Sequence, residues 1–418
     1  MTWREILIQD LPLSFRAWSP VFLTAFGVKE VEKSIKGMAL ALCVAGLAAQ
    51  PAMADDVSTK GGIKVTSDDG SFVGEFGGRL MLDGAVFDND AEENTSGTEF
   101  RRIRLHSKGK IYGLDYKVEF DFADGDTVTK NAYLAMKVLG GKLTVGQFKQ
   151  YFTMENLTSS RYITFMERSY LTSFSPDYNV GVGYWGNYGA IGYGVSAYNA
   201  YQDEDADGDD GPSGDNGTTE GTGGTARVIF APKLGEYGQI HIGGSMAKEG
   251  GVQGRNRVRV RPAGHLSDAS RVAIVDINTG ERSESTLYGL EFAGLAGPLS
   301  VQAEYVGGTY ETDTVEQDVA AFYAYTSYFL TGEVRPYDAK SGKFGRVKPR
   351  KSHGAVEVAV RYDYVENDSI DFEVESLTVG ANWYWNPQVR FMLNYIASDV
   401  AEGTDEPNAV TARMQFDF

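Results

Sequence analysis

Apolar and polar side chains alternate along most of the chain after residue 54, while helical periodicity is nearly absent. The alternation is clearest in four segments, 116–122, 356–364, 377–385 and 410–418, where every second side chain is aromatic or aliphatic. A period of two is that of an extended strand, whose successive side chains point to opposite faces. No segment after residue 54 approaches the roughly 20 apolar residues that a membrane-spanning helix needs. The pattern therefore predicts an all-β protein.

These segments are close to the length of a strand in an outer-membrane barrel and are separated by turn or loop residues. We predict sixteen strands, at 72–87, 99–111, 115–123, 129–138, 142–148, 180–187, 190–201, 224–232, 238–247, 282–293, 299–310, 319–331, 354–365, 373–385, 388–398 and 408–418. Because an even number lets an antiparallel sheet close on itself, we expect 55–418 to be a 16-stranded antiparallel transmembrane β-barrel with inward-folded loops. A soluble β-sandwich is the alternative, which the chain length and the alternating strand that ends in Phe418 disfavour.

The first 54 residues predict export. Lys33 and Lys36 precede the apolar run 38–49, which is followed by Ala52-Met-Ala54. A basic start, a short apolar stretch and small residues at a cleavage site are typical of a secretory signal peptide. We therefore interpret 1–54 as an upstream extension plus a signal peptide that is cleaved after Ala54, and we expect the mature chain in the bacterial outer membrane.

Composition narrows the chemistry. The 418 residues carry a net charge of −18 and a single Cys. This acidity argues against nucleic-acid binding, and one Cys excludes a disulfide framework or a multi-Cys metal site. The four His are scattered, and no G-x-S-x-G elbow is present. We therefore expect no enzyme, cofactor or metal site, with an outer-membrane lipase-type barrel as the enzyme alternative.

One row of arginines is the most specific feature of the chain. Arg255, Arg257, Arg259 and Arg261 alternate with other residues, so in an extended backbone their side chains project to one side. Neighbouring guanidinium groups then repeat about every 7 Å, within a Debye length of one another. By strand count the row follows the strand at 238–247, in an extracellular loop that could fold inward. A solvated loop edge is the alternative.

A second basic row lies on a predicted strand. Ile103 and Leu105 would face lipid, which places Arg102, Arg104, His106 and Lys108 toward the lumen. Arg101 has the parity of the lipid face, but near the extracellular end it can turn back over the rim. On the first strand, the same parity places Arg79 inward.

Three connections have unusual length or charge. The segment 149–179 is too long for a simple loop, contains Lys149, Arg161 and Arg168, and is placed to be an inward-folding third extracellular loop. The periplasmic connection 332–353 is also long, and its basic residues are Lys340, Lys343, Arg346, Lys348, Arg350 and Lys351. The segment 202–224 holds only acidic charges, which at an outer mouth would repel anions. Both basic connections could also be solvated surface loops.

Several of these segments resemble phosphate- and polyphosphate-selective outer-membrane porins of the O/P type. The resemblance lies in 99–105, 146–150, 163–169, 330–333 and 380–386, and it extends from about Gly74 to Phe418. It implies a homotrimer of barrels with an arginine ladder, here Arg255, Arg257, Arg259 and Arg261. It also implies a constriction at Arg79, Arg101 and Arg102 with a contribution from Arg168, and a basic periplasmic exit, here Lys340, Lys343, Lys348 and Lys351.

Together these features predict an anion-selective porin that conducts phosphate or polyphosphate by diffusion. Arginine forks match phosphate oxygens in a way that the point charge of lysine does not. Anions would pass the ladder and a narrow site at Arg79, Arg101, Arg102 and Arg104 and leave past the basic exit. The expected partners are these anions, outer-membrane lipid and lipopolysaccharide, and two further copies of the chain. The alternative is a general diffusion porin of weak selectivity.

Overall fold

The structure is a computed structural model of the whole chain. It describes residues 56–58, 63–125, 127–200, 221–253, 256–401 and 403–418. The predicted signal peptide, most of the acidic segment 202–224 and Arg255 therefore lie outside the described residues. What is described belongs to one compact unit, Asp55–Phe418.

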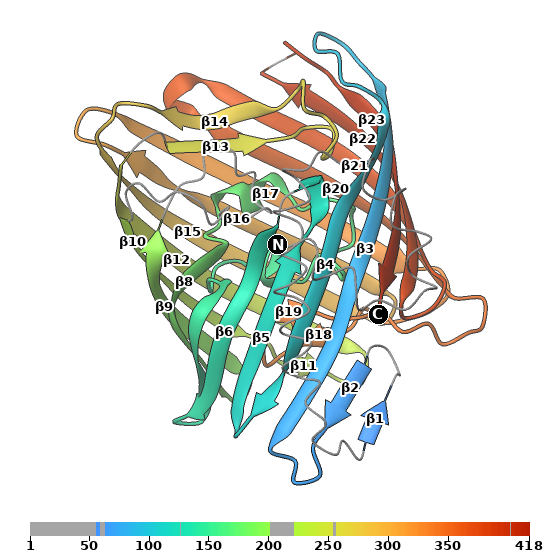
Figure 1. Cartoon of the computed structure of the whole chain (residues 1–418). Helices are drawn as coiled ribbons and strands as arrows, with labels where there is room; N and C mark the ends of the chain where they lie inside the picture. The colour runs from blue at the N-terminus through green and yellow to red at the C-terminus, as the bar shows by residue number, and fades with distance from the viewer. Residues whose placement is uncertain (1–55, 59–62, 126, 201–220, 254–255, 402) are drawn as a thin grey trace, which may run out of the picture. The chain divides into compact units, whose positions relative to one another are not determined.

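Sixteen antiparallel strands form a closed barrel, which confirms the predicted fold class (Figure 1). The strands are β3 (Phe72–Asp88), β4 (Gly97–Ile111), β5 (Leu114–Asp121), β6 (Val128–Val138), β7 (Gly141–Lys149), β8 (Tyr178–Tyr188), β9 (Ile191–Ala200), β10 (Gly221–Phe230), β12 (Gly238–Gln253), β15 (Arg282–Ala296), β16 (Leu299–Glu311), β17 (Glu316–Phe329), β20 (Ala355–Asn367), β21 (Phe372–Tyr384), β22 (Val389–Val400) and β23 (Asn408–Asp417). Each overlaps one predicted strand. The barrel closes where β23 pairs with β3, from Asn408 opposite Asp88 to Asp417 opposite Arg79.

The two faces of the strands differ as the alternation predicts. In β23, Val410, Ala412, Met414 and Phe416 are exposed on the outside, while Thr411, Arg413 and Gln415 between them are buried. β9 alternates in the same way along its whole length. The outward side chains are the apolar surface that a bilayer requires, and the polar ones face the interior. Among the described residues, no helix is long and apolar enough to cross a membrane.

The connections at one end of the barrel are mostly tight. Leu139 and Gly140 join β6 to β7 with φ of 51° and 79°, so this hairpin has two successive residues in the left-handed region. We call this end, where β23 finishes, the turn side, and the opposite end the loop side. Because strands alternate in direction, the predicted periplasmic connections all lie on the turn side.

Three longer connections hold the elements that fill the barrel. The loop 150–177, here called the inward loop, contains α4 (Met154–Leu157) and η2 (Tyr170–Phe174), and most of its side chains are buried. The loop-side connection after β12 contains the hairpin of β13 (Asn256–Val260) and β14 (Val272–Ile277). The turn-side connection 330–354, here called the basic turn, contains β18 (Tyr337–Asp338) and β19 (Lys343–Phe344).

A shared apolar core joins the inward loop and the β13–β14 hairpin to the barrel wall. Phe165 and Phe174 of the loop and Val258 and Val260 of β13 belong to one buried cluster with side chains of β15, β16, β17 and β20. Burial of this kind of apolar surface holds both loops inside the barrel rather than in solvent. The predicted inward folding is thereby confirmed for both loops.

Small elements complete the fold. These are β1 (Asp56–Ser58), β2 (Ile63–Thr66), β11 (Lys233–Leu234), η1 (Ala123–Gly125) and η3 (Asp368–Ile370). β2 pairs with residues 73–76 of β3, so the β1–β2 hairpin extends the sheet beyond the end of β23. The strand prediction did not include this hairpin.

Candidate functional site: a basic barrel interior

Arg79 joins the wall to the inward loop. It lies on the inward face of β3 and is buried. Its Nη1 donates to Ser160 Oγ at 2.7 Å, and its Nη2 lies 3.3 Å from Glu119 Oε1 on β5. The guanidinium group therefore contacts one carboxylate and the loop that crosses the lumen, as its predicted inward position requires.

A bulge in β4 brings Arg101 inside. Opposite Met81 and Leu82 of β3 stand Arg102 and Phe100, so the ladder skips one residue. Arg101 and Arg102 occupy the place of one residue, and both are buried while Phe100 is exposed. Sequence parity assigned Arg101 to the lipid face with a turn over the rim; a bulge, which alternation cannot reveal, is the actual cause of its inward position.

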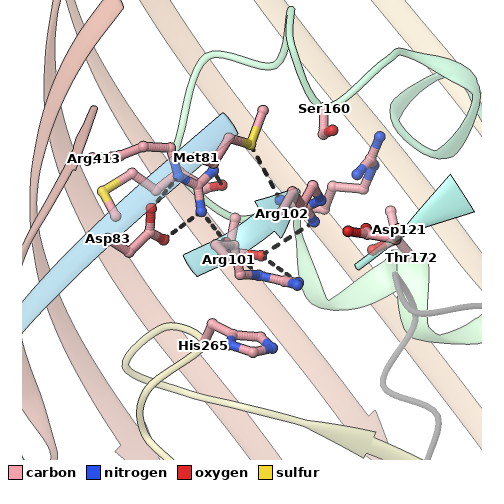
Figure 2. A network of polar contacts seen from close by, with 12 residues as sticks. Met81, Asp83, Arg101, Arg102, Asp121, Ser160, Thr172, His265 and Arg413 are labelled. Carbon is pink, nitrogen blue, oxygen red and sulfur yellow. Dashed lines mark hydrogen bonds and ion pairs between the residues drawn. The ribbon is translucent and has the colours of Figure 1, made fainter. Parts of the chain in front are cut away.

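Glu167 of the inward loop forms ion pairs with both arginines of this bulge. Arg101 contacts both of its carboxylate oxygens, with Nε at 3.1 Å and Nη2 at 3.2 Å, and Arg102 Nη2 lies 4.0 Å away. Figure 2 shows Arg102 beside Met81 and Arg413 beside Asp83. Burial alone would raise the pKa of Glu167, but the positive charges around it hold that pKa well below its usual range. The loop tip is thus fixed by an ionised carboxylate.

Arg104 and Arg168 lie further along the interior. Arg104 Nε donates to Asp121 Oδ2 at 2.5 Å within the wall. Arg168, on the inward loop, donates from Nε to the Glu155 carbonyl at 3.1 Å and from Nη2 to the Thr158 carbonyl. Burial lowers the pKa of Arg168. These hydrogen bonds tie two parts of the loop together. Arg168 also lines two separate hollows of the interior.

One hollow of the interior is a cavity of about 490 Å³, here called the basic cavity. It lies between β3–β8, the inward loop and the basic turn. Eight basic residues line it, namely Arg79, Arg104, Lys117, Lys142, Lys149, Arg161, Arg168 and Lys343. Among the described lining residues, Glu119 is the single acid. The lining is therefore strongly positive in a chain whose net charge is negative.

The arginine row on β13 faces a smaller hollow of about 60 Å³. Val258 and Val260 point into the apolar core, so the alternate positions of β13 face the other way. Arg259 and Arg261 line this hollow together with Arg101 and Arg168. Arg257 has the same parity, is half-buried and stands opposite Asp276 in the hairpin register. The structure thus brings two ladder arginines to the predicted constriction, while Arg102 is completely buried beside it.

The basic turn folds into the barrel from the turn side. The Phe344 amide lies 3.4 Å from Thr158 Oγ1 of the inward loop, and Lys343 lines the basic cavity. Arg346, Lys348 and Arg350 line a separate hollow of about 440 Å³ together with Glu333. Lys340 and Lys351 are exposed and line neither space. Of the predicted exit residues, Lys343 therefore lines the basic cavity and Lys348 lines the separate hollow. Lys340 and Lys351 lie on the open surface.

Sequence analysis missed the arginines that hold the inward loop. Arg390 donates to the carbonyls of Ile163 and Thr164 at 2.7 and 2.8 Å, and Arg361 donates to that of Glu167 at 2.9 Å. Arg413 contacts Asp83 at 2.6 Å and Glu167 at 2.5 Å. Strand parity alone places all three inward. All three donate to main-chain carbonyls of a loop that is distant in sequence, a pairing for which the sequence carries no signal.

A second missed network fixes the basic turn. Arg227 of β10 contacts both oxygens of Glu291 at 2.8 and 2.6 Å and donates to the Gly342 carbonyl at 2.9 Å. His241 of β12 lies 2.9 Å from the same carboxylate and also contacts the Tyr337 hydroxyl. Turn and wall are thereby joined through buried polar groups, which favours one position of the turn.

Comparison with known proteins gives a family match over the barrel. Residues 75–418 match the family described as phosphate-selective porin O and P. Porin O of Pseudomonas aeruginosa is 28% identical to the chain and covers 91% of it, with 97% of that relative covered in turn. The match begins close to the first barrel strand and ends at the last residue.

Solved structures show the same fold at low identity. OmpT of Vibrio cholerae, in its trimer form, aligns with a TM-score of 0.55 and 14% identity over 82% of this chain and 99% of its own. An anion-selective porin from Comamonas acidovorans aligns with a TM-score of 0.55 and 12% identity over the same shares. These likenesses support the closed barrel described above.

Proposed function

The chain belongs to the phosphate-selective porin O and P family, and we propose that it is an anion-selective channel for phosphate or polyphosphate. The family and the closed barrel indicate a channel of the bacterial outer membrane rather than an enzyme. The finer proposal concerns which ion passes and by which residues. It depends on the interior of the barrel.

The observation that carries the proposal is the charge of the basic cavity. Eight basic side chains and one acidic side chain line a space of about 490 Å³ inside a wall that faces lipid. Low-dielectric walls focus the potential of the lining, so the local charge and not the net charge of −18 governs selectivity. An anion that enters is stabilised by the lining, whereas a cation of equal size is repelled.

The proposed path runs from the loop side to the turn side. Anions meet the arginine ladder, of which Arg259 and Arg261 line the narrow hollow with Arg101 and Arg168. They then enter the basic cavity at Arg79, Arg104 and Arg161 and leave past Lys343 and the basic turn. Several sites in series let an ion replace its hydration shell and still depart.

Guanidinium geometry favours phosphate over halide. Charge-assisted bonds from an arginine fork to two phosphate oxygens are shorter and stronger than neutral ones, and a halide offers no second oxygen to complete the fork. The family that matches residues 75–418 is described as phosphate-selective, and the Comamonas neighbour is titled anion-selective. These titles support the proposal for this chain by similarity.

We also infer assembly and export. The trimer form of the OmpT neighbour supports a homotrimer here, with outward apolar side chains contacting lipid, lipopolysaccharide and the adjoining copies. Cleavage after Ala54 is the proposed export step, and N-terminal sequencing of the protein from outer membranes should begin at Asp55. A first residue within 1–54 would contradict it.

Conductance through planar bilayers tests the channel proposal. In a potassium chloride gradient, the reversal potential should have the sign of chloride permeation, and added phosphate should block chloride current. A general diffusion porin, the alternative, would give a reversal potential near zero and no block. That result would leave the barrel and family intact and remove phosphate selectivity.

A further inference from the structure

The basic cavity has an aromatic side as well as a basic one. Tyr133 of β6, Phe148 of β7, Tyr151 at the start of the inward loop and Trp185 of β8 line it, and their rings form a continuous row. The ring centroids are 6.4 Å apart between Tyr133 and Phe148, 5.9 Å between Phe148 and Tyr151, and 5.5 Å between Tyr151 and Trp185. Of these rings, Tyr133, Tyr151 and Trp185 are only half-buried, so part of each faces the cavity.

Glycines in the wall make room for this row. A Cβ on Gly183 of β8 would stand 2.8 Å from Phe148 and 2.9 Å from Tyr151. A Cβ on Gly194 of β9 would stand 2.5 Å from Trp185 and 3.0 Å from Tyr151. Any larger residue at these positions would push the rings out of place. The rings, which are inclined to one another by 44–82°, therefore pack directly against the backbone of these glycines.

The basic side offers groups that can bind an anion. Most lining cations are paired, for example Lys149 with Asp177 at 2.7 Å and Lys117 with Glu119 at 3.0 Å. Arg161 and Lys343 line the cavity without an ion pair to any residue that the structure describes. Arg161 lies further along the inward loop that also carries Tyr151, and Lys343 lies on the basic turn, which carries none of the four rings. Unpaired cations and open rings thus border one space.

We propose that the basic cavity binds phosphate monoesters that carry an aromatic group, with the phosphate at Arg161 and Lys343 and the ring against Tyr151. This inference rests on the proposed anion channel and specifies its substrate class. The volume of about 490 Å³ lies within the range of roughly 300–1,000 Å³ typical of small-molecule sites. Inorganic phosphate fills only part of that space and gains nothing from the aromatic side.

Three anions of similar charge test the site. Inorganic phosphate, methyl phosphate and phenyl phosphate should each be added to the purified full-length channel in a bilayer, and the block of chloride current measured. Phenyl phosphate should block at a concentration about fivefold lower than methyl phosphate, since ring pairing adds to the shared phosphate contacts. Equal half-blocking concentrations for the two esters would overturn the proposal. Loss of block by all three anions contradicts the channel proposal itself.

Variants separate the ring surface from general damage. In Tyr151→Leu, the preference for phenyl over methyl phosphate should fall to near one while block by inorganic phosphate is retained. Tyr184→Leu is the matched control. Tyr184 directly precedes Trp185 on β8, but its ring packs against Tyr193 and not against the aromatic row. If Tyr151→Leu does not assemble, Tyr133→Leu should reduce the same preference. A preference unchanged in the variant that assembles would contradict the aromatic site.

Discussion

Inward-pointing arginines have different roles in two parts of the barrel wall. The cavity wall, strands β3–β8, surrounds the basic cavity with the inward loop and the basic turn. The anchor wall, strands β20–β23, holds Arg361, Arg390 and Arg413, and none of its described residues lines that cavity. On the anchor wall each guanidinium group donates to a carbonyl of the inward loop. An inward arginine is therefore no measure of anion binding until its partners are known.

The two groups of arginines differ in which contacts they would lose if an anion bound to them. The anchor arginines are nearly fully buried, so the cost of desolvating them is offset by the carbonyls, carboxylates and aromatic rings that they contact. An anion could displace those partners only by leaving the loop carbonyls unsatisfied. Arg161 is half-buried and borders open space, so an anion there adds contacts without removing any ion pair among the described residues. Anion selectivity should thus depend on the cavity wall. The geometry of the pore should depend on the anchor wall.

The largest effect should come from Arg413→Ala on the anchor wall. Removing one partner of a buried ion pair costs roughly 3–5 kcal/mol, and here both Asp83 and Glu167 lose a contact. The loop should detach, so single-channel conductance should rise and the chloride-to-potassium permeability ratio should fall toward one. Heating before electrophoresis should unfold the barrel at a lower temperature.

Arg282→Ala is the control for this variant, because Arg282 is exposed at the loop-side end of β15. It should leave conductance and heat stability unchanged. An Arg413→Ala channel with the parent's conductance would show that Arg361 and Arg390 hold the loop without it. The contrast between the two walls would then be weaker than the contacts indicate.

Arg161→Ala on the inward loop should have the next largest effect. Loss of a charge-assisted contact to phosphate should raise the half-blocking phosphate concentration about tenfold. The Arg161 carbonyl still accepts from Gln415 Nε2, so the loop should stay in place and conductance should change little. Arg161→Lys keeps the charge without the fork and should give an intermediate value. Equal block in all three channels would remove Arg161 from the phosphate path.

Sequence alternation predicted the barrel far better than its interior contacts. Every barrel strand was found, because a lipid face and a polar lumen impose a period of two on each strand. The inward position of Arg101 was predicted, but its cause was not, because a bulge shifts parity by one residue without changing the pattern on either side. The roles of Arg390 and Arg413 could not be found, since their partners are fixed by how a loop distant in sequence folds across the lumen.

A smaller effect is expected from Arg257→Ala combined with Arg259→Ala on β13. Arg257 lies beside the constriction and Arg259 lines it, and both should act mainly by raising the local anion concentration. The phosphate block should weaken about threefold at low salt and much less at high salt, since screening shortens their reach. Val258 and Val260 keep the hairpin in the core. A block unchanged at low salt would exclude the ladder from the mechanism.

The smallest effect should be a pH dependence set by Lys343. Burial lowers the pKa of this lysine below the ordinary value, because the charged form is poorly solvated inside the barrel. As pH rises, Lys343 should therefore lose its proton before exposed lysines do, and the anion preference should decline by less than about twofold at a pH below the usual lysine range. Reversal potentials measured across this pH interval report the change. Lys343→Arg keeps its charge there and should abolish the decline, whereas a decline that persists in Lys343→Arg would assign it to another group. Because Lys343 belongs to a turn held by Arg227, this measurement also shows whether the basic turn contributes charge to the cavity or only closes it.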